Sequence, residues 1–405
     1  MPWLAPRSSL VATLALLGLV ACSESEAGQD EGSSIGEEVG ETGGDGDGEG
    51  ETGTSEGETG ETTGTTDTDT TDTDSESETD TSEDEGDPGF GPWCEAPPAC
   101  DAPHPDPGPE LDWEEFDTNI TVLAGDPNHR IRDMFYVPGE PQWLLGKFTY
   151  GLTDKDLTEE RVDVYVLRGC QGPWELLGSA HTTDDGQHPT VEGVEDSGGW
   201  VYFQIPEDEQ LELGRHKVHM VVRGDLSWAD GYVEVVEQGT PIFLSDVDGT
   251  LTTFESEEFG DFLLGEVPSA NEFSATALGI LQDKGFHAMY LTARPEWLVA
   301  RTREFVEVRG YPPGIIHTSL FFDGATGDKA EAYKSGELAM LAGKGLVPIY
   351  VFGNTDSDAA AYHAANILPL ENRVFFQFTD PQGGRRIESY GELIAEFEAL
   401  ADPCR

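Results

Sequence analysis

Positive charge is scarce in this sequence. Only 22 Lys and Arg stand against 80 Asp and Glu in 405 residues, which gives a formal net charge of −58. A chain this acidic repels the phosphate backbone of nucleic acids, so no nucleic-acid partner is expected. After the first 22 residues no apolar run is long enough to cross a bilayer. The length allows two or three domains.

Lys and Arg are absent altogether from residues 23–88, which hold 25 of the acidic residues, with Gly, Ser and Thr filling almost everything else. Such a segment cannot bury enough apolar surface to offset the entropy of ordering, and its charges repel. We therefore predict a disordered, extended acidic linker, with a root-mean-square reach on the order of 45 Å if it is flexible. The alternative is an acidic tail that binds a partner.

Residues 1–22 hold one Arg, an apolar run over residues 10–20 and small residues before Cys22. The run is too short to span a bilayer comfortably and has the anatomy of a secretion signal. Its ending, LVAC, resembles a bacterial lipobox. That resemblance implies cleavage before Cys22, lipidation of its thiol, and an exported protein held to a bacterial membrane by acyl chains, in the periplasm or on the cell surface. An ordinary signal peptide with a chance cysteine is the alternative.

If Cys22 is lipidated, four cysteines remain: Cys94, Cys100, Cys170 and Cys404. An even number in an exported chain favours two disulfides. Cys94 with Cys100 is the most local pairing among the three possible connectivities. The cysteine spacing matches no zinc-binding pattern.

Two folded regions follow a Pro-rich lead-in at residues 89–128. Residues 129–238 contain seven short strand-like runs separated by Gly, Asp and Pro turns, which predict an antiparallel β-sandwich of immunoglobulin-like size. No catalytic cluster stands out in it. Asp184, Asp185 and Asp196 could form a calcium site, but a pair of polar turns is the preferred interpretation.

The periodicity changes in residues 239–405, where apolar strands alternate with helical segments. One of the helices is expected to start on Pro295, since proline is favoured in a first turn. This alternation predicts a mainly parallel sheet with helices on both faces. In such sheets ligands bind beyond the carboxyl ends of the strands.

The stretch PIFLSDVDGTLTTF begins as an apolar strand and ends in Asp246 and Asp248. A calcium loop of the EF-hand kind is one interpretation. That loop needs glycine at its sixth place and helices on both sides, whereas Leu251 fills this place and a strand leads in. The calcium interpretation is therefore set aside.

Asp246-Val247-Asp248-Gly249-Thr250 closely resembles the signature of the haloacid-dehalogenase phosphatases, and the other motifs follow in order. Thr292 ends a strand in MYLTAR, lysines follow near residue 330, and GNTDSD spans residues 353–358. The resemblance implies a haloacid-dehalogenase-like α/β fold with a Rossmann-like parallel sheet.

The resemblance also implies roles for the acidic residues. Asp246 would attack phosphorus and form an aspartyl-phosphate, while Asp248 would protonate the leaving oxygen and then activate water. Mg²⁺ would be held by Asp246, by the backbone carbonyl of Asp248 and by Asp358, and Asn354 would orient the metal shell or its waters.

Fixed donors must neutralise the charge of the phosphoryl group. Thr292 would donate to the phosphate, which Gly249 and Thr250 would also contact, and Lys334 would balance the charge around nucleophile and phosphate. Lys329 is the competing lysine. For Thr292 taken alone, a strand-end hydroxyl without function would be the preferred interpretation.

A more specific resemblance covers about residues 145–400. The stretch GRHKVHMVVRGDLSWADGYVEVVEQGTPIFLSDVDGTLT, with LTARPEWLVARTREFV and GYPPGIIHTSLFFDG, is similar to the C-terminal region of the membrane-associated phosphatidylinositol-transfer proteins, the retinal-degeneration-B family, where a β-rich segment precedes a lipin-type domain. In that alignment the family's lysine falls on Lys334. Lipins are Mg²⁺-dependent phosphatidate phosphatases, whereas the transfer-protein relatives lack the first aspartate and are thought to bind phosphatidic acid without hydrolysing it. This sequence keeps both aspartates, but Thr355 stands where lipins usually have Arg.

The spacing between motifs leaves no room for a cap domain, so the site should be open to a bulky substrate. These features predict a Mg²⁺-dependent phosphatase acting on a phosphatidate-like lipid at a membrane. The alternatives are a non-catalytic phosphatidic-acid-binding module, or a phosphatase of proteins or soluble phosphate esters. An acidic protein would approach an anionic membrane only through local basic residues, although solvated surface charge is their more ordinary interpretation: Arg294, Arg301, Arg303, Arg385 and Arg386.

Overall fold

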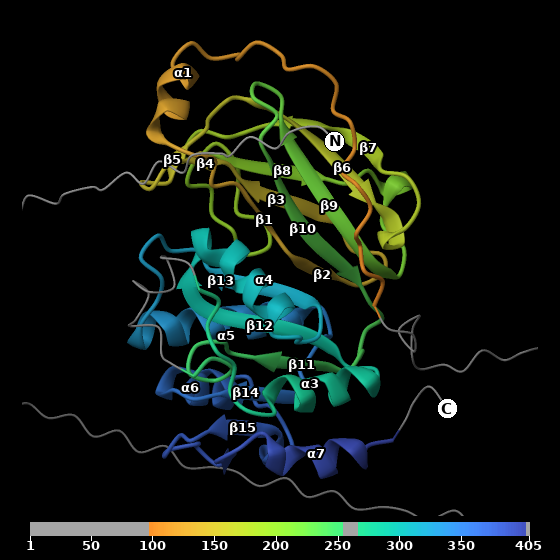
Figure 1. Cartoon of the computed structure of the whole chain (residues 1–405), viewed down its shortest axis with the longest axis vertical. Coiled ribbons are helices and arrows are strands. Elements are labelled where there is room, and N and C mark those ends of the chain that lie inside the picture. Colours follow the sequence, from red (N-terminus) through yellow and green to blue (C-terminus); the bar gives the residue numbers. More distant parts are fainter. Residues whose placement is uncertain (1–96, 254–265, 402–405) are drawn as a thin grey trace, which may run out of the picture. The chain divides into compact units, whose positions relative to one another are not determined.

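A computed structural model describes residues 97–253 and 266–401. In these residues a β-sandwich is followed by a parallel sheet with helices (Figure 1). The predicted lipidation site at Cys22, the predicted linker at residues 23–88, and Cys94 and Cys404 lie outside the described residues, so those predictions stay predictions. None of the helices within the described ranges is long and apolar enough to cross a membrane.

In the described part of the sandwich two main sheets face each other across the core. Each of the seven predicted runs contains at least one strand. One sheet has the order β1 (Arg130–Arg132), β3 (Trp143–Lys147), β8 (Trp200–Gln204); the other has the order β2 (Met134–Tyr136), β10 (Trp228–Val235), β9 (Gly214–Val222), β6 (Arg161–Leu167), β7 (Glu175–His181); and β4 (Thr149–Tyr150) pairs with β5 (Lys155–Asp156). Short helical turns connect them: α1 (Thr118–Thr121), η2 (Val122–Ala124), η3 (Arg168–Cys170) and η4 (Glu207–Glu209).

The prediction of a wholly antiparallel sandwich is wrong at one pair of strands. β2 runs parallel to β10, whereas the other pairs of the two main sheets are antiparallel. The cause lies in the run RIRDMFY, which looks like one strand but divides at Asp133. Its first half pairs in one sheet and its second half in the other, so the chain crosses the sandwich at this residue.

Asp184 and Asp196, two of the residues weighed above as calcium ligands, take part in the hydrogen bonds of polar turns. Asp196 accepts hydrogen bonds from the Thr183 hydroxyl at 2.6 Å and from the backbone N–H of His188 at 2.8 Å. The backbone N–H of Asp184 donates to the Gln187 side chain at 3.0 Å. These contacts support the interpretation as turns.

Cys100 forms a disulfide with Cys170, 70 residues away in the sequence. The most local of the three possible connectivities, Cys94 with Cys100, is therefore not the one that forms. The lead-in lies along the sandwich, where the indole N–H of Trp174 donates to the carbonyl of Pro103 at 2.7 Å and the guanidinium of Arg223 donates to the carbonyl of Pro109 at 2.8 Å. This course brings Cys100 to η3, so spatial proximity rather than sequence proximity decides the pairing.

We expect removal of this disulfide in the double variant Cys100→Ala/Cys170→Ala to lower the free energy of unfolding by about 4 kcal/mol, because a closed loop of about 70 residues restricts the unfolded chain. Guanidinium unfolding of the variant and the parent protein measures the difference. If the free energy of unfolding falls by less than about 1 kcal/mol, the disulfide does not restrict the unfolded chain as expected.

The second region contains six parallel strands within its described residues. Their order is β13 (Gly314–Ser319), β12 (His287–Pro295), β11 (Ile242–Ser245), β14 (Tyr350–Gly353), β15 (Arg373–Phe376), β16 (Arg385–Ile387). The connecting helices are α3 (Ser274–Asp283), η6 (Glu296–Leu298), α4 (Val299–Val308), α5 (Gly327–Gly343), α6 (Asp356–Ala364), η7 (Leu370–Asn372) and α7 (Gly391–Glu398). The prediction that a helix starts on Pro295 is wrong, because this proline ends β12 and a 3₁₀ turn precedes α4.

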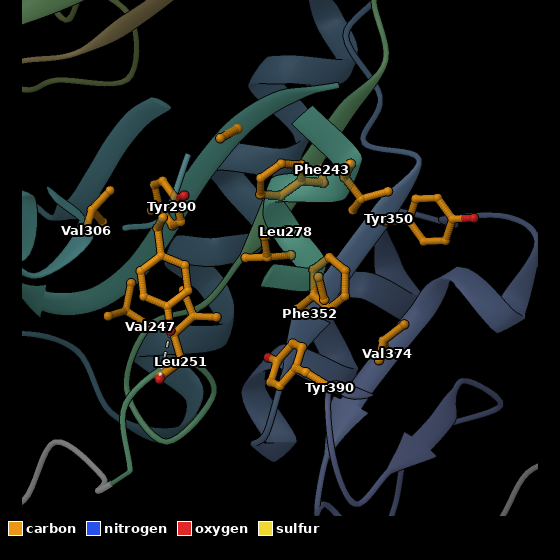
Figure 2. Close-up of a cluster of buried hydrophobic side chains, with 14 of the residues drawn as sticks. Phe243, Val247, Leu251, Leu278, Tyr290, Val306, Tyr350, Phe352, Val374 and Tyr390 are labelled. Carbon is orange, nitrogen blue, oxygen red and sulfur yellow. Dashed lines mark hydrogen bonds between the residues drawn. The ribbon is translucent and has the colours of Figure 1, made fainter. Parts of the chain in front are cut away.

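Helices cover both faces of this sheet, as predicted (Figure 1). Side chains alternate along β11, so Phe243 packs into one core with α3, α4 and α7, while Ile242 and Leu244 pack into the other with α5 and α6. Figure 2 shows the first core, where Phe243 lies among Tyr290, Phe352 and residues of neighbouring elements. Because β11 is buried on both faces and pairs with β12 and β14, the ends of these three strands are fixed side by side.

Candidate active site

The loop after β11 carries both aspartates of the DVDGT motif and is held rigidly. Gly249 has a φ of +69°, a left-handed conformation that favours glycine. The side-chain amide of Asn271 donates to the backbone carbonyls of Thr250 at 2.8 Å and of Thr252 at 3.0 Å. The Tyr390 hydroxyl donates to the same Thr250 carbonyl at 3.2 Å. The aspartates are therefore positioned before any ligand arrives.

Lys334 of α5 bridges two carboxylates of the candidate site, Asp246 after β11 and Asp358 in α6. Its ammonium donates to Asp246 Oδ1 at 2.8 Å and to Asp358 Oδ1, and all three residues are at most 3% exposed. The other oxygen of Asp246, Oδ2, accepts a hydrogen bond from the Thr250 hydroxyl at 3.1 Å. The competing Lys329 lies on the surface and pairs with Asp323 at 3.1 Å. The geometry thus places Lys334, and not Lys329, beside the predicted nucleophile.

The carboxylates outweigh the cations at this point of the molecule. The pKa of Asp246 is raised to about 7, chiefly by burial; Asp358 and Asp248 add to the rise, and Lys334 opposes it. Burial alone would lower the pKa of Lys334, but Asp246 and Asp358 raise it well above its usual range. A protonated lysine among several carboxylates leaves an excess of negative charge that an added cation would relieve.

Asp358 also caps helix α6. Its Oδ2 accepts hydrogen bonds from the backbone N–H groups of Asn354 and Thr355, both at 3.1 Å, and from the Thr355 hydroxyl at 2.7 Å. Thr355 is the N-cap residue and completes a capping box with Asp358. A Cβ on Gly353 would lie 2.5 Å from the Cβ of Asp358, so only glycine fits at the end of β14. The carboxylate of Asp358 is thus engaged on both oxygens.

Asp248 is held by an arginine that the sequence did not assign to the site. The Arg294 guanidinium donates to both oxygens of Asp248, with Nη2–Oδ1 at 2.7 Å and Nε–Oδ2 at 2.9 Å. Its Nη1 donates to the Thr302 hydroxyl of α4 at 3.0 Å. A register shift in β12 between Thr292 and Pro295 marks this point of the strand, and such irregularities re-aim side chains. The only clue in the sequence was the position of Arg294, two residues beyond the predicted Thr292.

A cavity of about 270 Å³ opens where these residues meet, and Asp246, Asp248 and Lys334 line it. This volume has room for several groups the size of a water molecule, because one water molecule occupies about 30 Å³ in the liquid. Asp356, an exposed residue in the first turn of α6, also lines the cavity and was missed, although it lies within the GNTDSD motif. Ser357 lines it as well.

Other predicted residues support the carboxylates and are not among the residues that line this cavity. The Thr292 hydroxyl donates to Asp248 Oδ2 at 3.1 Å, and the Thr250 hydroxyl donates to Asn354 Oδ1 at 2.8 Å. The backbone N–H of Gly249 donates to the Thr252 hydroxyl at 2.9 Å. The predicted contacts of Gly249, Thr250 and Thr292 with phosphate therefore stay predictions, and their observed role is to hold the loop and its aspartates.

The donors of this site suit a hard divalent cation such as Mg²⁺. The groups available are carboxylates and a backbone carbonyl, and burial together with the neighbouring Asp358 and Asp248 raises the pKa of Asp246. Asp246 and the carbonyl of Asp248 fit the predicted set. Asp358 is more fully engaged than Asp246, because its Oδ2 alone accepts three hydrogen bonds while its Oδ1 accepts the Lys334 ammonium, whereas Asp356 lies at the exposed side of the cavity.

The sandwich contacts the elements that carry the site residues. Arg132 of β1 pairs with Glu337 of α5, one helical turn from Lys334. Arg130 pairs with Glu296 at 3.0 Å, two residues after Arg294. These ion pairs tie one sandwich strand to α5, which carries Lys334, and to η6, which directly follows the strand that carries Arg294.

Asp133 makes the third of these contacts. Both its oxygens accept hydrogen bonds from Arg303 of α4 at 2.9 Å, and Oδ2 also accepts the backbone N–H of Ile316 in β13 at 3.0 Å. α4 carries Thr302, the residue that holds Arg294. A single short stretch of the sandwich thus reaches α4, α5, η6 and β13.

The arginines considered for membrane contact are paired with acids. Arg294 is 1% exposed and bound to Asp248, and Arg303 pairs with the buried Asp133. These two arginines therefore serve neither as membrane contacts nor as solvated surface charges. The other three are partly exposed and form ion pairs with neighbouring acids: Arg301 with Glu304, Arg385 with Glu396 and Arg386 with Glu388.

The ion pair of Glu337 gives a pH-dependent prediction. Burial alone would raise the pKa of Glu337, but Arg132 and His317 lower it to about 2. A lowered pKa stabilises the fold at pH values above that of the unfolded carboxyl, and this stabilisation is lost as the pH falls toward 2. The shift from about 4.5 to about 2 corresponds to about 3 kcal/mol.

We therefore expect Glu337→Gln to destabilise the protein by about 3 kcal/mol at pH 7. The difference in the free energy of unfolding between the variant and the parent protein should narrow as the pH falls below about 4.5. Urea unfolding at several pH values measures this difference. Glu331→Gln, at an exposed position of the same helix, is the matched control. A gap that stays constant between pH 7 and pH 3 would contradict the ionic role of Glu337.

Two family models match this chain. The model described as "PITM 1-3, beta-sandwich domain" matches residues 127–235, and "PITM 1-3, LNS2 domain" matches residues 243–376. The first therefore covers the sandwich and the second covers the candidate site from β11 to β15. These matches confirm the predicted resemblance to the retinal-degeneration-B relatives. The lipin-type and haloacid-dehalogenase assignments stay predictions.

Curated relatives agree with these matches. Human membrane-associated phosphatidylinositol transfer protein 2 is 27% identical over 265 residues, which are 65% of this chain and 18% of that protein. The protein retinal degeneration B of Drosophila melanogaster is 26% identical over 290 residues, 71% of this chain and 21% of that protein. The matches thus span about a fifth of these relatives. A solved structure of titin kinase and its flanking domains covers 30% of this chain and 22% of that one at 8% identity and a TM-score of 0.17, too low to bear on the fold.

Proposed function

We propose that this chain is a Mg²⁺-dependent phosphatase of haloacid-dehalogenase type that acts on a phosphatidate-like lipid at a membrane surface. One observation carries the proposal: Asp246 is buried beside Lys334 and lines the same cavity as Asp248. A carboxylate with an ammonium and a second carboxylate beside one cavity is the set that phosphoryl transfer through an aspartyl-phosphate requires.

Each residue has a step that its position permits. An oxygen of Asp246 attacks phosphorus, so that the bond from phosphorus to the leaving oxygen breaks as the acyl-phosphate bond forms. Asp248 gives a proton to the leaving oxygen and later takes one from the water that hydrolyses the intermediate. Lys334 stabilises the negative charge at Asp246, and the ordered loop keeps the attack geometry. Bound Mg²⁺ would supply charge neutralisation of the phosphoryl oxygens.

The choice of a lipid substrate is supported by three lines of argument. The relatives are named as membrane-associated phosphatidylinositol transfer proteins, and the matched LNS2 domain includes the cavity residues up to Ser357. The N-terminal sequence is consistent with export and with acyl anchoring at Cys22, which would keep the enzyme at a bacterial membrane, in the periplasm or on the cell surface. The described segment 296–326 between β12 and α5 holds η6, α4 and β13 and no inserted cap domain.

A binding module without turnover is the second candidate, and one observation favours it. Arg294 holds both oxygens of Asp248, so the carboxylate must leave this pair, at least in part, to exchange a proton with a substrate. A lipid phosphate could occupy the cavity without that rearrangement. The presence of Asp246, which attack on phosphorus requires, favours the phosphatase.

The test is phosphate release from phosphatidate in mixed micelles by the full-length protein. We expect release that EDTA abolishes and added Mg²⁺ restores. Asp246→Asn should lower kcat at least about a thousandfold because the nucleophile is lost. Asp323→Asn, at an exposed position outside the cavity, should leave the rate unchanged.

Parallel measurements separate the alternatives. Binding of phosphatidate vesicles without release by the parent protein would replace the phosphatase with the binding module. Faster Mg²⁺-dependent release from a phosphopeptide or p-nitrophenyl phosphate than from phosphatidate would keep the chemistry but contradict the lipid substrate. Equal release by the parent protein and Asp246→Asn would contradict the assignment of the nucleophile.

A further inference from the structure

Two histidines and an aspartate meet on the sandwich, away from the cavity. His104 belongs to the lead-in, His219 to β9 and Asp230 to β10. His104 Nε2 lies 3.0 Å from Asp230 Oδ2, and His219 Nδ1 lies 2.7 Å from Asp230 Oδ1. The two imidazole rings stack with centroids 4.3 Å apart, so each can turn a nitrogen toward the same carboxylate.

The separations of these atoms match those of ligands around one ion. The candidate ligand atoms lie within 4.8 Å of one another. Around a tetrahedral zinc ion with bonds of about 2.0–2.1 Å, neighbouring ligand atoms lie about 3.3 Å apart. The observed nitrogen–oxygen distances of 2.7 and 3.0 Å require only a small opening of the cluster to admit an ion between the three side chains.

The surroundings hold the three side chains in place. On the lead-in, the disulfide of Cys100 and the hydrogen bond from Trp174 to the carbonyl of Pro103 fix the chain on the N-terminal side of His104. Asp230 pairs across the sheet with His219 in the register of β9 and β10. Such a site would not have to assemble from flexible parts, which lowers the entropy cost of binding an ion.

We propose that His104, His219 and Asp230 bind a divalent transition-metal ion, and that the bound ion clamps the lead-in to the sandwich. Imidazole nitrogens favour Zn²⁺, Cu²⁺ or Ni²⁺ over Mg²⁺ and Ca²⁺, which prefer oxygen. Two histidines, one carboxylate and a position open to water form a donor set that suits Zn²⁺. Since His104 is on the exposed side, an ion can enter from solvent. This proposal is independent of the phosphatase.

Lys217 competes with the ion for the carboxylate. Its ammonium lies 2.8 Å from Asp230 Oδ2, on the oxygen that also faces His104. A hydrogen-bonded cluster of Lys217, Asp230 and the two histidines is the alternative without a metal. The two accounts differ in what removal of Lys217 does: zinc should bind more tightly if the ion must displace the ammonium.

The test is calorimetric titration of the full-length protein with ZnCl₂ after chelator treatment, in excess Mg²⁺ and without thiol reductants, so that the Cys100–Cys170 disulfide stays closed. We expect one zinc ion to bind with micromolar or tighter affinity at this site. His104→Ala should weaken this event by more than the 10- to 100-fold that loss of an outer-shell partner costs. Lys217→Met should tighten it. His181→Ala, an exposed histidine paired with Glu114, is the matched control and should leave it unchanged.

The outcomes are distinct even if a variant is destabilised. His104 is partly exposed, so its replacement tests the ligand without opening the core, and thermal unfolding with and without zinc supplies a second measurement. Zinc should raise the midpoint of the parent protein and of Lys217→Met, but not that of His104→Ala. Equal zinc affinity in the parent protein and His104→Ala, or no binding in either, would overturn the proposal.

Discussion

The candidate site depends on one buried cation, the ammonium of Lys334, between two buried carboxylates. It joins Asp246 at the end of β11 to Asp358 at the start of α6, and burial makes each unpaired charge costly. The same contact explains the other constraints nearby. Gly353 lacks a side chain so that Asp358 can approach the strand end, and the fixed loop after β11 keeps Asp246 against the lysine.

The sandwich helps to hold this site in place. Its residues Arg132 and Asp133 bind α5 and α4, which carry Lys334 and Thr302, and Arg130 binds Glu296, two residues after Arg294. Phe135 and Val236 add apolar contacts, because they pack into one of the cores of the parallel sheet. A region in which the sequence shows no catalytic cluster therefore acquires a structural role: it contacts the helices that hold the side chains of the candidate site.

The parts of the fold that follow from local pattern could be predicted. An apolar run ending in Asp246 predicted a buried strand with the candidate site at its carboxyl end, and the motifs at Thr292 in β12 and after β14 lie beside it as expected. The parts set by tertiary contacts could not. β16 has three residues, too few for a periodic pattern, and the role of Arg294 depends on its contacts across the site. The disulfide of Cys100 depends on the course of the lead-in, which no spacing reveals.

The central claim is that Asp246 attacks phosphorus, and chemical trapping tests it most directly. The full-length protein would be quenched during turnover of phosphatidate with Mg²⁺ and reduced with borohydride, which converts an aspartyl-phosphate into homoserine. Mass spectrometry of the peptide that contains DVDGT then locates the product. The account predicts homoserine at position 246, dependent on Mg²⁺ and absent without phosphatidate. Turnover without homoserine at 246, or with the product at 248 or 358, would contradict it.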